Sequence, residues 1–374
     1  MRVLGVVAEY NPFHNGHKYH IEAAKSALSA DGVVAVMSGN YVQRGEPALF
    51  DKFTRARYAL LGGADLVIEL PAYFSLKSAE GFARGGVALL EATGIVDAIS
   101  FGSECGDIKK LRQAARILAD EPDQFKKVLA QKLQNGASFA SARESAIKEI
   151  NPALADVVRH PNNILGVEYL KALEGSRITP HTIKRKGEYH SKSSDVEFAS
   201  ATAVREALAS GGDVSRHLPY IPDSTAGCDL SDFEQIILYS LTVSKAAPPD
   251  SGDGLWERIQ KADKSSLDAL LQGAKTRRHT MSRIKRALLN QAIDNHLPEN
   301  LLPSYIRVLG IGKQGATLLN MMKDKATLPV IIKPSKYRIN DGIWHLESRA
   351  TDIYSLVTGR KQGENLTTSP VLIQ

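Results

Sequence analysis

The feature that most constrains the fold is a short apolar run near the start of the chain that ends in a loop with two histidines. Residues Val3 to Ala8 are apolar and predict a buried first strand. The segment EYNPFHNGH follows, from Glu9 to His17, and the segment from Tyr19 to Ala30 then has the pattern of a helix. A strand that turns directly into a helix predicts the first unit of an α/β fold.

The loop between this strand and this helix has the features of an anion site. Free backbone N–H groups and the positive end of the helix dipole point at such a junction. Gly16 lets the backbone approach a phosphate closely, and His14 and His17 can face the same side and donate hydrogen bonds, whether neutral or protonated. Two alternatives are a metal-binding histidine pair, for which no third ligand is evident nearby, and ordinary loop histidines.

The pattern H-x-G-H after a first strand resembles the signature of the nucleotidyltransferase superfamily, which includes the class I aminoacyl-tRNA synthetases. These enzymes attack the α-phosphorus of a nucleoside triphosphate and release pyrophosphate. The segment SATAVR, Ser200 to Arg205, is similar to the S/T-x-x-R element that holds the triphosphate opposite the histidines, although Ala199 stands where the family usually has isoleucine. Read alone, Ser200 and Thr202 are hydroxyls that cap a helix, and Arg205 is a cation able to hold phosphates.

The bulk properties are those of a soluble globular protein. The chain has 374 residues, enough for two domains, with 43% hydrophobic and 24% charged residues. No apolar run approaches the ~20 residues of a membrane span, and the absence of a signal peptide before the first strand predicts a cytoplasmic protein. Cys105 and Cys228 are too few for a disulfide framework or a zinc site. The net charge of +6 permits a polyanionic partner without requiring one.

Strand-like and helix-like segments alternate through the first two hundred residues. This rhythm predicts the α/β class, with a Rossmann-like parallel sheet and the ligand beyond the carboxyl ends of the strands. The further predicted strands are Val33–Met37, Leu66–Leu70, Ala98–Phe101 and Thr179–Lys184. The predicted helices are Phe53–Leu61, Lys77–Ala92, His160–Leu173 and Ser200–Ser210.

The sequence predicts two domains, with the boundary between them near Gly211 and Gly212. Residues 1–211 would form the nucleotidyltransferase-like catalytic domain, with a helical insertion over about residues 108–150. Residues 212–374 would form a mainly helical, basic accessory domain suited to a nucleic acid. In this second part, Gly310, Gly312 and Gly315 spell G-x-G-x-x-G, but the next predicted strand, Val330–Ile332, ends in Lys333 rather than in an acid. We therefore interpret these glycines as a tight turn of the accessory domain and not as a dinucleotide site.

Polar loops follow several of the predicted strands and suit a substrate pocket. The candidates are Ser38, Gly39, Arg44, Asp51 and Glu104. Arg44 can hold a carboxylate or phosphate, whereas Asp51 can position a metal or simply cap the helix after it. Gly102 would let a base or ribose lie against the backbone. Asn162 can offer its amide to adenine or ribose, or can serve as a helix cap.

The segment KTRRHTMSRIKRALL is a concentrated basic stretch in the second half of the chain. It contains no acid, and part of it has the pattern of a helix. Such a segment suits a nucleic-acid backbone, and the alternative is a solvated helix face. The candidate tRNA-binding residues are Lys275, Arg277, Arg278, Arg283, Lys285 and Arg286.

Taken in order, the motifs resemble the bacterial tRNA(Met) cytidine acetate ligase family over nearly the whole chain. These motifs are EYNPFHNGH, SGNYVQRGEPA, GADLVIELP, FGSE, PNNILGVEYL, SATAVR and KTRRHTMSRIKRALL. The resemblance implies an enzyme that uses ATP to form acetyl-adenylate from acetate. The enzyme would then acetylate N4 of the wobble cytidine of elongator tRNA(Met), giving N4-acetylcytidine, without acetyl-CoA. Mg²⁺ is expected to assist, although the sequence assigns no metal ligands.

The resemblance also implies which residues form the site. The catalytic candidates are His14, His17, Lys18 and Arg205. The ATP-binding candidates are Val7, Ala8, Glu9, Tyr10, Asn11, Pro12, Phe13, His14, Asn15, Gly16, His17, Lys18, Tyr19, His20, Gly102, Asn162, Arg185, Lys186, Ser200 and Thr202. No general base for the transfer of the acetyl group stands out, and Asp51 and Glu104 are the available carboxylates.

Two other functions fit parts of the sequence. A small-molecule nucleotidyltransferase would have a similar first half, but such enzymes are often shorter and lack the basic second half. A non-catalytic RNA-binding relative would have no physical reason to keep His14, His17 and Arg205 together.

Overall fold

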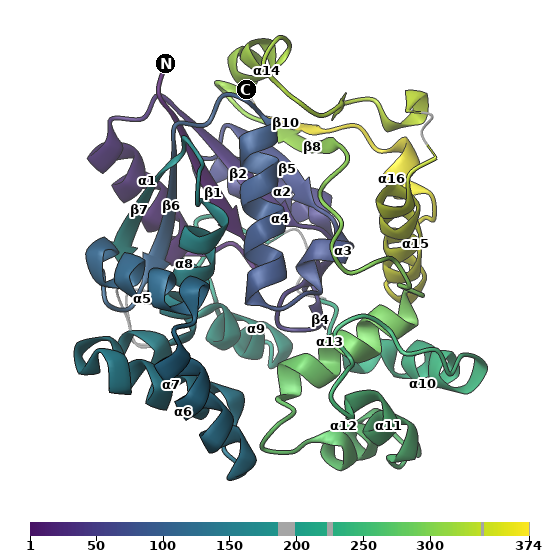
Figure 1. Cartoon of the computed structure of the whole chain (residues 1–374). Coiled ribbons are helices and arrows are strands. Elements are labelled where there is room, and N and C mark those ends of the chain that lie inside the picture. The colour runs from purple at the N-terminus through teal and green to yellow at the C-terminus, as the bar shows by residue number, and fades with distance from the viewer. Residues whose placement is uncertain (186–198, 223–226, 338–339, 374) are drawn as a thin grey trace.

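The computed structural model describes residues 1–185, 199–222, 227–337 and 340–373, so the candidate Lys186 lies outside the described residues. One sheet runs through the centre of the molecule (Figure 1). Its strands are β1 (Val3–Ala8), β2 (Gly32–Ser38), β5 (Leu66–Leu70), β6 (Ala98–Ser103), β7 (Thr179–Lys184), β8 (Ile306–Ile311), β9 (Val330–Ile331) and β10 (Val371–Leu372). Their order is β10-β8-β5-β2-β1-β6-β7, with β9 beside β8.

The predicted parallel sheet is confirmed in β5, β2, β1, β6 and β7, which pair parallel throughout. From β1 the chain moves outward to β2 and β5, and it then returns to the other side of β1 to form β6 and β7. The strand order therefore reverses between β1 and β6. At such a switch point, crossovers leave the sheet in opposite directions and open a crevice beyond the strand ends, where α/β proteins bind ligands.

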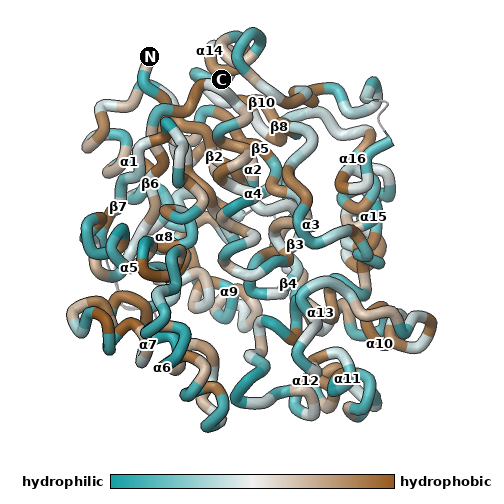
Figure 2. Tube along the Cα trace, viewed as in Figure 1, coloured by the Kyte–Doolittle hydropathy of each residue, from teal (hydrophilic) through white to brown (hydrophobic). Residues whose placement is uncertain are grey.

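Alternating side chains place a hydrophobic core on each face of the sheet. In β2, Val34 and Val36 belong to one core, whereas Val33, Ala35 and Met37 belong to the other. Figure 2 shows these central strands among the hydrophobic segments of the chain. The helices α3 (Ala72–Ser75), α4 (Ala79–Ala92) and α8 (Pro161–Ala172) contribute to the first core. The helices α1 (Asn15–Leu28), α2 (Lys52–Leu61) and α9 (Ala201–Ala209) contribute to the second.

Most element boundaries agree with the sequence-based prediction within two residues, and two that differ near the switch point bear on the site. The helix expected from Tyr19 begins four residues earlier, at Asn15, because the His14 side chain caps it. The strand expected to end at Phe101 continues to Ser103, so Gly102 lies within β6 and not after it. Residues 108–150 are helical, as expected, and form α5 (Ile108–Asp120), α6 (Asp123–Gln134) and α7 (Phe139–Ile150), while their status as an insertion stays a prediction.

The second half of the chain is mainly helical, as expected. Its helices are α10 (Glu234–Val243), α11 (Leu255–Lys261), α12 (Leu267–Ala274), α13 (Met281–Ala292), α14 (Gly315–Met322), α15 (Gly342–Val357) and α16 (Glu364–Thr367). No helix in the described ranges is both long enough and apolar enough to cross a membrane.

The second half also extends the sheet of the first half, which the sequence did not indicate. Strand β8 pairs antiparallel with β5, and β10 pairs parallel with β8. The G-x-G-x-x-G turn between β8 and α14 packs on the first half, where Gly312 donates its N–H to the Asp65 carbonyl (2.8 Å). A Cβ on Gly315 would lie 2.5 Å from the same oxygen, so close backbone approach explains this glycine. The division near residue 211 stays a prediction.

A fully buried lysine joins the two halves. Lys52 Nζ donates to Glu69 on β5 (2.6 Å) and to Glu347 on α15 (3.1 Å), and also to Thr351 and Asn365. Burial and the neighbouring Glu69 raise the pKa of Glu347 to about 8. A Glu347 that holds its proton at neutral pH reduces the negative charge buried around Lys52, which limits the cost of burying the cluster.

We expect that Lys52→Met lowers the free energy of unfolding by about 3–5 kcal/mol, because it leaves buried acids without their cation. Urea denaturation measures this loss. The matched control is Lys25→Met, which removes a long 3.9 Å pair between a partly exposed lysine and Asp65, whose carboxylate keeps its hydrogen bond from the Val33 N–H, and which should cost less than about 1 kcal/mol. Equal losses in the two variants would contradict the assigned role of the cluster.

Candidate active site at the end of β1

The loop of residues 9–17, here the histidine loop, leaves the carboxyl end of β1 at the switch point and leads into α1. Tyr10 has a positive φ of 48°, and the Asn11–Pro12 peptide bond is cis. Asn11 Oδ1 accepts from the Leu49 N–H (2.7 Å), and the Phe13 carbonyl accepts from the Tyr220 hydroxyl (2.8 Å). Phe13 packs directly on Gly62, where any Cβ would overlap its ring. The loop is therefore held from several sides.

The two histidines cap the helix that follows them. His14 Nδ1 accepts from the Gly16 N–H (3.1 Å), and His17 Nδ1 accepts from the His14 N–H (3.2 Å). This reciprocal arrangement is a capping box in which imidazoles replace the usual hydroxyl and carboxylate. The rings stack with centroids 3.8 Å apart, which confirms that they face the same side. Because both Nδ1 atoms accept, the hydrogen bonds assign the proton of each neutral ring to Nε2.

The surroundings keep both rings neutral. Burial, and then the cations of Arg185 and Arg205 together with His217, lower the pKa of His14 from 6.5 to about 3. Burial, His14 and Arg185 lower the pKa of His17 well below its usual value. At neutral pH each ring therefore presents an Nε2–H donor and no charge, so the positive charge for a polyphosphate must come from the arginines.

Arg205 reaches the histidine loop from α9. Ser200 caps that helix through the Ala203 N–H (3.2 Å), as the motif predicts. Arg205 Nη1 donates to the Asn11 carbonyl (2.7 Å), while Nη2 contacts Thr202 Oγ1 (3.3 Å) and lies 3.6 Å from Glu46 Oε2. The structure therefore brings together H-x-G-H and S/T-x-x-R, which are almost two hundred residues apart in the sequence.

Gly102 and Arg185 form the neighbouring edge of the site, at the ends of β6 and β7. A Cβ on Gly102 would lie 3.2 Å from Arg185 Cγ, so the side chain of Arg185 lies over this glycine. Asn162 stands at the start of α8, where its backbone N–H and its Nδ2 both donate to Glu104 Oε1. The candidates Gly102, Asn162 and Arg185 thus come from three elements that converge on the end of β6.

Other ATP-binding candidates support the loop or lie beside it. Val7 and Ala8 end β1, Glu9 Oε1 accepts from the Gln43 N–H (2.9 Å), and Tyr10 packs on His17 at 4.9 Å between ring centroids. Asn15 is tied to the segment after α9 through the carbonyls of Arg216 and His217. Pro12 lies between these residues in the loop.

The last three of these candidates lie on α1, after the paired histidines. Lys18 forms an exposed pair with Glu22 (3.9 Å), and Tyr19 is partly exposed beside it. His20 contacts Ser100 Oγ on β6 (3.1 Å). The predicted catalytic role of Lys18 stays a prediction.

Most of the substrate-pocket candidates use their polar groups within the fold. Asp51 is a helix cap, because its carboxylate accepts from Phe53 and Thr54 and pairs with Arg360 (3.1 Å). Glu104 caps α8 and accepts from the backbone of Asn162 and Asn163. Ser38 and Gly39 are buried behind the site. Arg44 lies at the tip of the hairpin formed by β3 (Tyr41–Val42) and β4 (Glu46–Pro47), near Glu9.

The structure divides the basic segment into an exposed loop and a helix whose cations are paired, and its binding to tRNA stays a prediction. Lys275, Arg277 and Arg278 are exposed in the loop before α13. On α13, however, Arg286 is only 7% exposed and pairs with Asp250 (3.0 Å). Arg283 pairs with Asp250 and Asp253, and Lys285 pairs with Glu46 (2.9 Å). The acids that pair with these cations come from other segments of the chain, so the sequence of the basic segment alone could not reveal the pairing.

Sequence reasoning missed Arg55, Glu46 and Tyr220, which organise the histidine loop. Arg55 is fully buried and donates to the Glu9 carbonyl (2.8 Å). Glu46 links Arg205 to Lys285, and Tyr220 holds Phe13. Each of these residues resembles an ordinary surface residue in the sequence, so no local signal marked them.

The neutral state of His14 makes stability depend on pH. Its pKa is lower in the folded chain than in the unfolded one, so acidification from pH 7.5 to pH 5 protonates only the unfolded chain. This protonation should lower the free energy of unfolding of the wild-type protein by about 2 kcal/mol. The variant His14→Asn keeps the helix cap but lacks the imidazole, so its loss over the same pH interval should be about 2 kcal/mol smaller. Urea denaturation of both proteins at the two pH values measures the difference. Identical losses would contradict the depressed pKa.

Known proteins are similar to this chain over nearly its whole length. A profile of the HIGH nucleotidyl transferase family matches residues 1–368. Proteins named tRNA(Met) cytidine acetate ligase from Thermoanaerobacter sp. (strain X514) and Caldanaerobacter subterraneus subsp. tengcongensis are 41% and 42% identical, each over 95% of both chains.

The similarity to solved structures also extends over the whole chain. Crystal structures of Thermotoga maritima TmcAL, one bound with alpha-thio ATP and one without ligand, match with TM-scores of 0.88 and 0.89. Each is 34% identical and covers 100% of both chains. The chain therefore belongs to the HIGH nucleotidyl transferase family and, within it, to the tRNA(Met) cytidine acetate ligases.

Proposed function

We propose that the protein is an ATP-dependent acetate ligase that forms acetyl-adenylate and acetylates N4 of the wobble cytidine of elongator tRNA(Met) in the cytoplasm. The observation that carries the proposal is the convergence of two Nε2–H donors and two arginines at the end of β1. This arrangement suits a bound triphosphate. Relatives that match nearly the full chain are named for the acetate ligase activity, and one was crystallised with an ATP analogue.

The first step would join acetate to AMP. A carboxylate oxygen of acetate attacks the α-phosphorus of ATP, and the bond from that phosphorus to the pyrophosphate oxygen breaks. The reaction needs alignment and stabilisation of phosphate charge more than a protein nucleophile. His14 and His17 would donate to phosphate oxygens through Nε2–H, while Arg205 and Arg185 would supply positive charge. Asn11 and Thr202 hold the Arg205 guanidinium at the loop before ATP arrives.

The second step would transfer the acetyl group to the RNA. The N4 amine attacks the acetyl carbonyl, AMP leaves, and the nitrogen loses a proton. The carboxylates that the sequence offered as bases, Asp51 and Glu104, are both occupied as helix caps. We therefore assign neither of them to this proton, and the chain's contribution to the second step is to hold and shield the adenylate.

The acids of the described residues are not gathered into a metal-binding cluster. The described residues include no group of three or more His, Cys, Asp or Glu side chains that could hold a metal. The carboxylates nearest the histidine loop, Glu9 and Glu46, accept from Gln43 and pair with Arg205 and Lys285. Mg²⁺ prefers substrate phosphates and water as ligands, so we propose that it enters with ATP.

Incorporation of radioactive acetate into tRNA tests the proposed activity. The purified protein is incubated with labelled acetate, ATP and total bacterial tRNA, without acetyl-CoA. We expect labelled tRNA, and loss of the label when ATP is omitted. ATP binding without labelled tRNA would contradict the proposal and would favour a small-molecule nucleotidyltransferase.

A variant pair that keeps the helix cap isolates the role of the imidazoles. His14→Asn with His17→Gln preserves an acceptor at both capping positions but removes both Nε2–H donors. We expect at least a hundredfold loss of acetate-dependent ATP–pyrophosphate exchange, with unchanged tRNA affinity and thermal stability at pH 7.5. Exchange at the wild-type rate would show that the histidines are not part of the catalytic site.

A further inference from the structure

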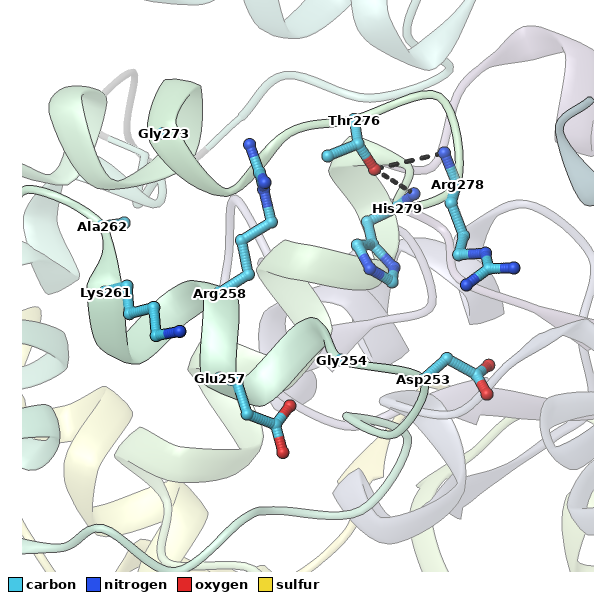
Figure 3. A pocket seen from close by; sticks show the side chains of 10 residues that line it. All are labelled: Asp253, Gly254, Glu257, Arg258, Lys261, Ala262, Gly273, Thr276, Arg278 and His279. Carbon is cyan, nitrogen blue, oxygen red and sulfur yellow. Dashed lines mark hydrogen bonds between the residues drawn. The ribbon is translucent and has the colours of Figure 1, made fainter. Parts of the chain in front are cut away.

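A second candidate site lies on the helices of the C-terminal half. A cavity of about 580 Å³ is formed by α11, α12 and the loop before α13 (Figure 3). Its size falls in the range of about 300–1,000 Å³ that is common for ligand sites. Its lining includes Arg258, Lys261, Arg278 and His279. This loop is the exposed part of the basic segment that the sequence singled out, and the reaction described above does not use it.

A closed turn sets the direction of the two loop side chains. Thr276 Oγ1 accepts from the N–H groups of Arg278 (3.2 Å) and His279 (2.9 Å), and the Thr276 N–H donates to the His279 carbonyl (3.3 Å). In the view of Figure 3, the His279 ring lies below this turn, between the side chains of Arg258 and Arg278. The turn therefore presents an imidazole and a guanidinium to the same cavity.

His279 has a buried nitrogen that lacks a partner. The residue is 5% exposed, and its Nδ1 makes no hydrogen bond with any described residue. Burial, Arg283 and Arg278 lower its pKa, so the ring is neutral at physiological pH. Buried polar atoms in folded proteins are normally paired. An unpaired ring nitrogen beside a cavity suits a ligand that supplies a hydrogen bond.

The charges that line the cavity favour an anionic ligand. Arg258, Lys261 and Arg278 contribute three cations, against the two acids Asp253 and Glu257. Asp253 is already paired with Arg283 (3.5 Å), and Arg258 is anchored through Nε to the Ala274 carbonyl (3.0 Å). Within the described ranges, the side chains of Lys261 and Arg278 make no hydrogen bond or ion pair. They remain available for phosphate oxygens.

Helix α13 connects the cavity to the histidine loop. Arg283 donates to the carbonyls of Asp250 and Gly252 at the edge of the cavity. Two residues later, Lys285 pairs with Glu46, and Glu46 also pairs with Arg205 at the histidine loop. The pair between Arg283 and Asp253, which lines the cavity, therefore links one wall of the cavity through α13 to the site of adenylate formation. This link favours a polymer that contacts both places over a free mononucleotide.

We propose that this cavity receives one unstacked nucleotide of the RNA substrate, with its phosphate on Arg278 and its base or ribose against His279. The assignment rests on the proposed function and deepens it, because it locates a contact made only by the RNA. Proteins commonly recognise single-stranded RNA by splaying out a base and holding the adjacent phosphate.

The test compares Arg278→Ala with Arg277→Ala, which removes the same charge from an exposed neighbour that does not line the cavity. His279→Leu is the second cavity variant. Fluorescence anisotropy measures the affinity of each protein for labelled elongator tRNA(Met) at fixed salt, and acetate-dependent ATP–pyrophosphate exchange without tRNA reports the integrity of the ATP site. We expect both cavity variants to weaken tRNA binding about tenfold or more, Arg277→Ala to weaken it less than threefold, and all three to keep wild-type exchange.

The other outcomes separate this proposal from the proposed function. Equal losses of affinity in Arg277→Ala and Arg278→Ala would overturn the cavity in favour of diffuse attraction. Unchanged affinity in both cavity variants, or loss of exchange in both, would also overturn it. The tRNA affinities of the variants could differ as expected while the wild-type protein makes no acetylated tRNA. That result would support the RNA site and contradict the acetate ligase function.

Discussion

One buried guanidinium holds together the loops that leave the first two strands. Arg55 has no exposed surface, and it donates to the carbonyls of Glu9 (2.8 Å), Ser38 (3.0 Å) and Phe50 (2.8 Å), and also to that of Gly39. The Glu9 carbonyl lies at the start of the histidine loop, those of Ser38 and Gly39 lie at the end of β2, and that of Phe50 lies just before α2. Without a donor each would be a buried unpaired acceptor, and without them the guanidinium would be a buried unpaired charge. The loops and the arginine therefore depend on each other.

The consequence is a site whose donors are prepared before substrate arrives. The histidine loop is held from behind by Arg55 and from the side by Tyr220, while the capping bonds at the start of α1 orient both imidazoles. The rings remain neutral because they are buried beside cations. Charge comes instead from Arg205 and Arg185, which converge from α9 and from the end of β7. Neutral donors and separate cations can stabilise a triphosphate without the rings having to change protonation state.

Sequence reasoning was most reliable where a local pattern and the tertiary structure require the same residue. The strands Val3–Ala8, Leu66–Leu70 and Thr179–Lys184 have the bounds expected from apolar runs and turn residues. It was least reliable where a polar side chain can serve more than one purpose. Asp51 and Glu104 proved to be helix caps, and α13 proved to be neutralised by Asp250 and Glu46. A carboxylate or a cation has the same appearance in a sequence whether it faces a substrate or another side chain.

The sequence by itself determined the α/β rhythm, the histidine loop, the S/T-x-x-R element and the family to which they belong, because each is carried by adjacent residues. Only the tertiary structure decided which charged groups remain available. It placed Lys52 between acids from both halves, added β8 and β10 to the sheet of the first half, and left Arg278 exposed beside the unpaired nitrogen of His279. The physical reason is that pairing and desolvation depend on neighbours in space, and these neighbours come from segments hundreds of residues apart.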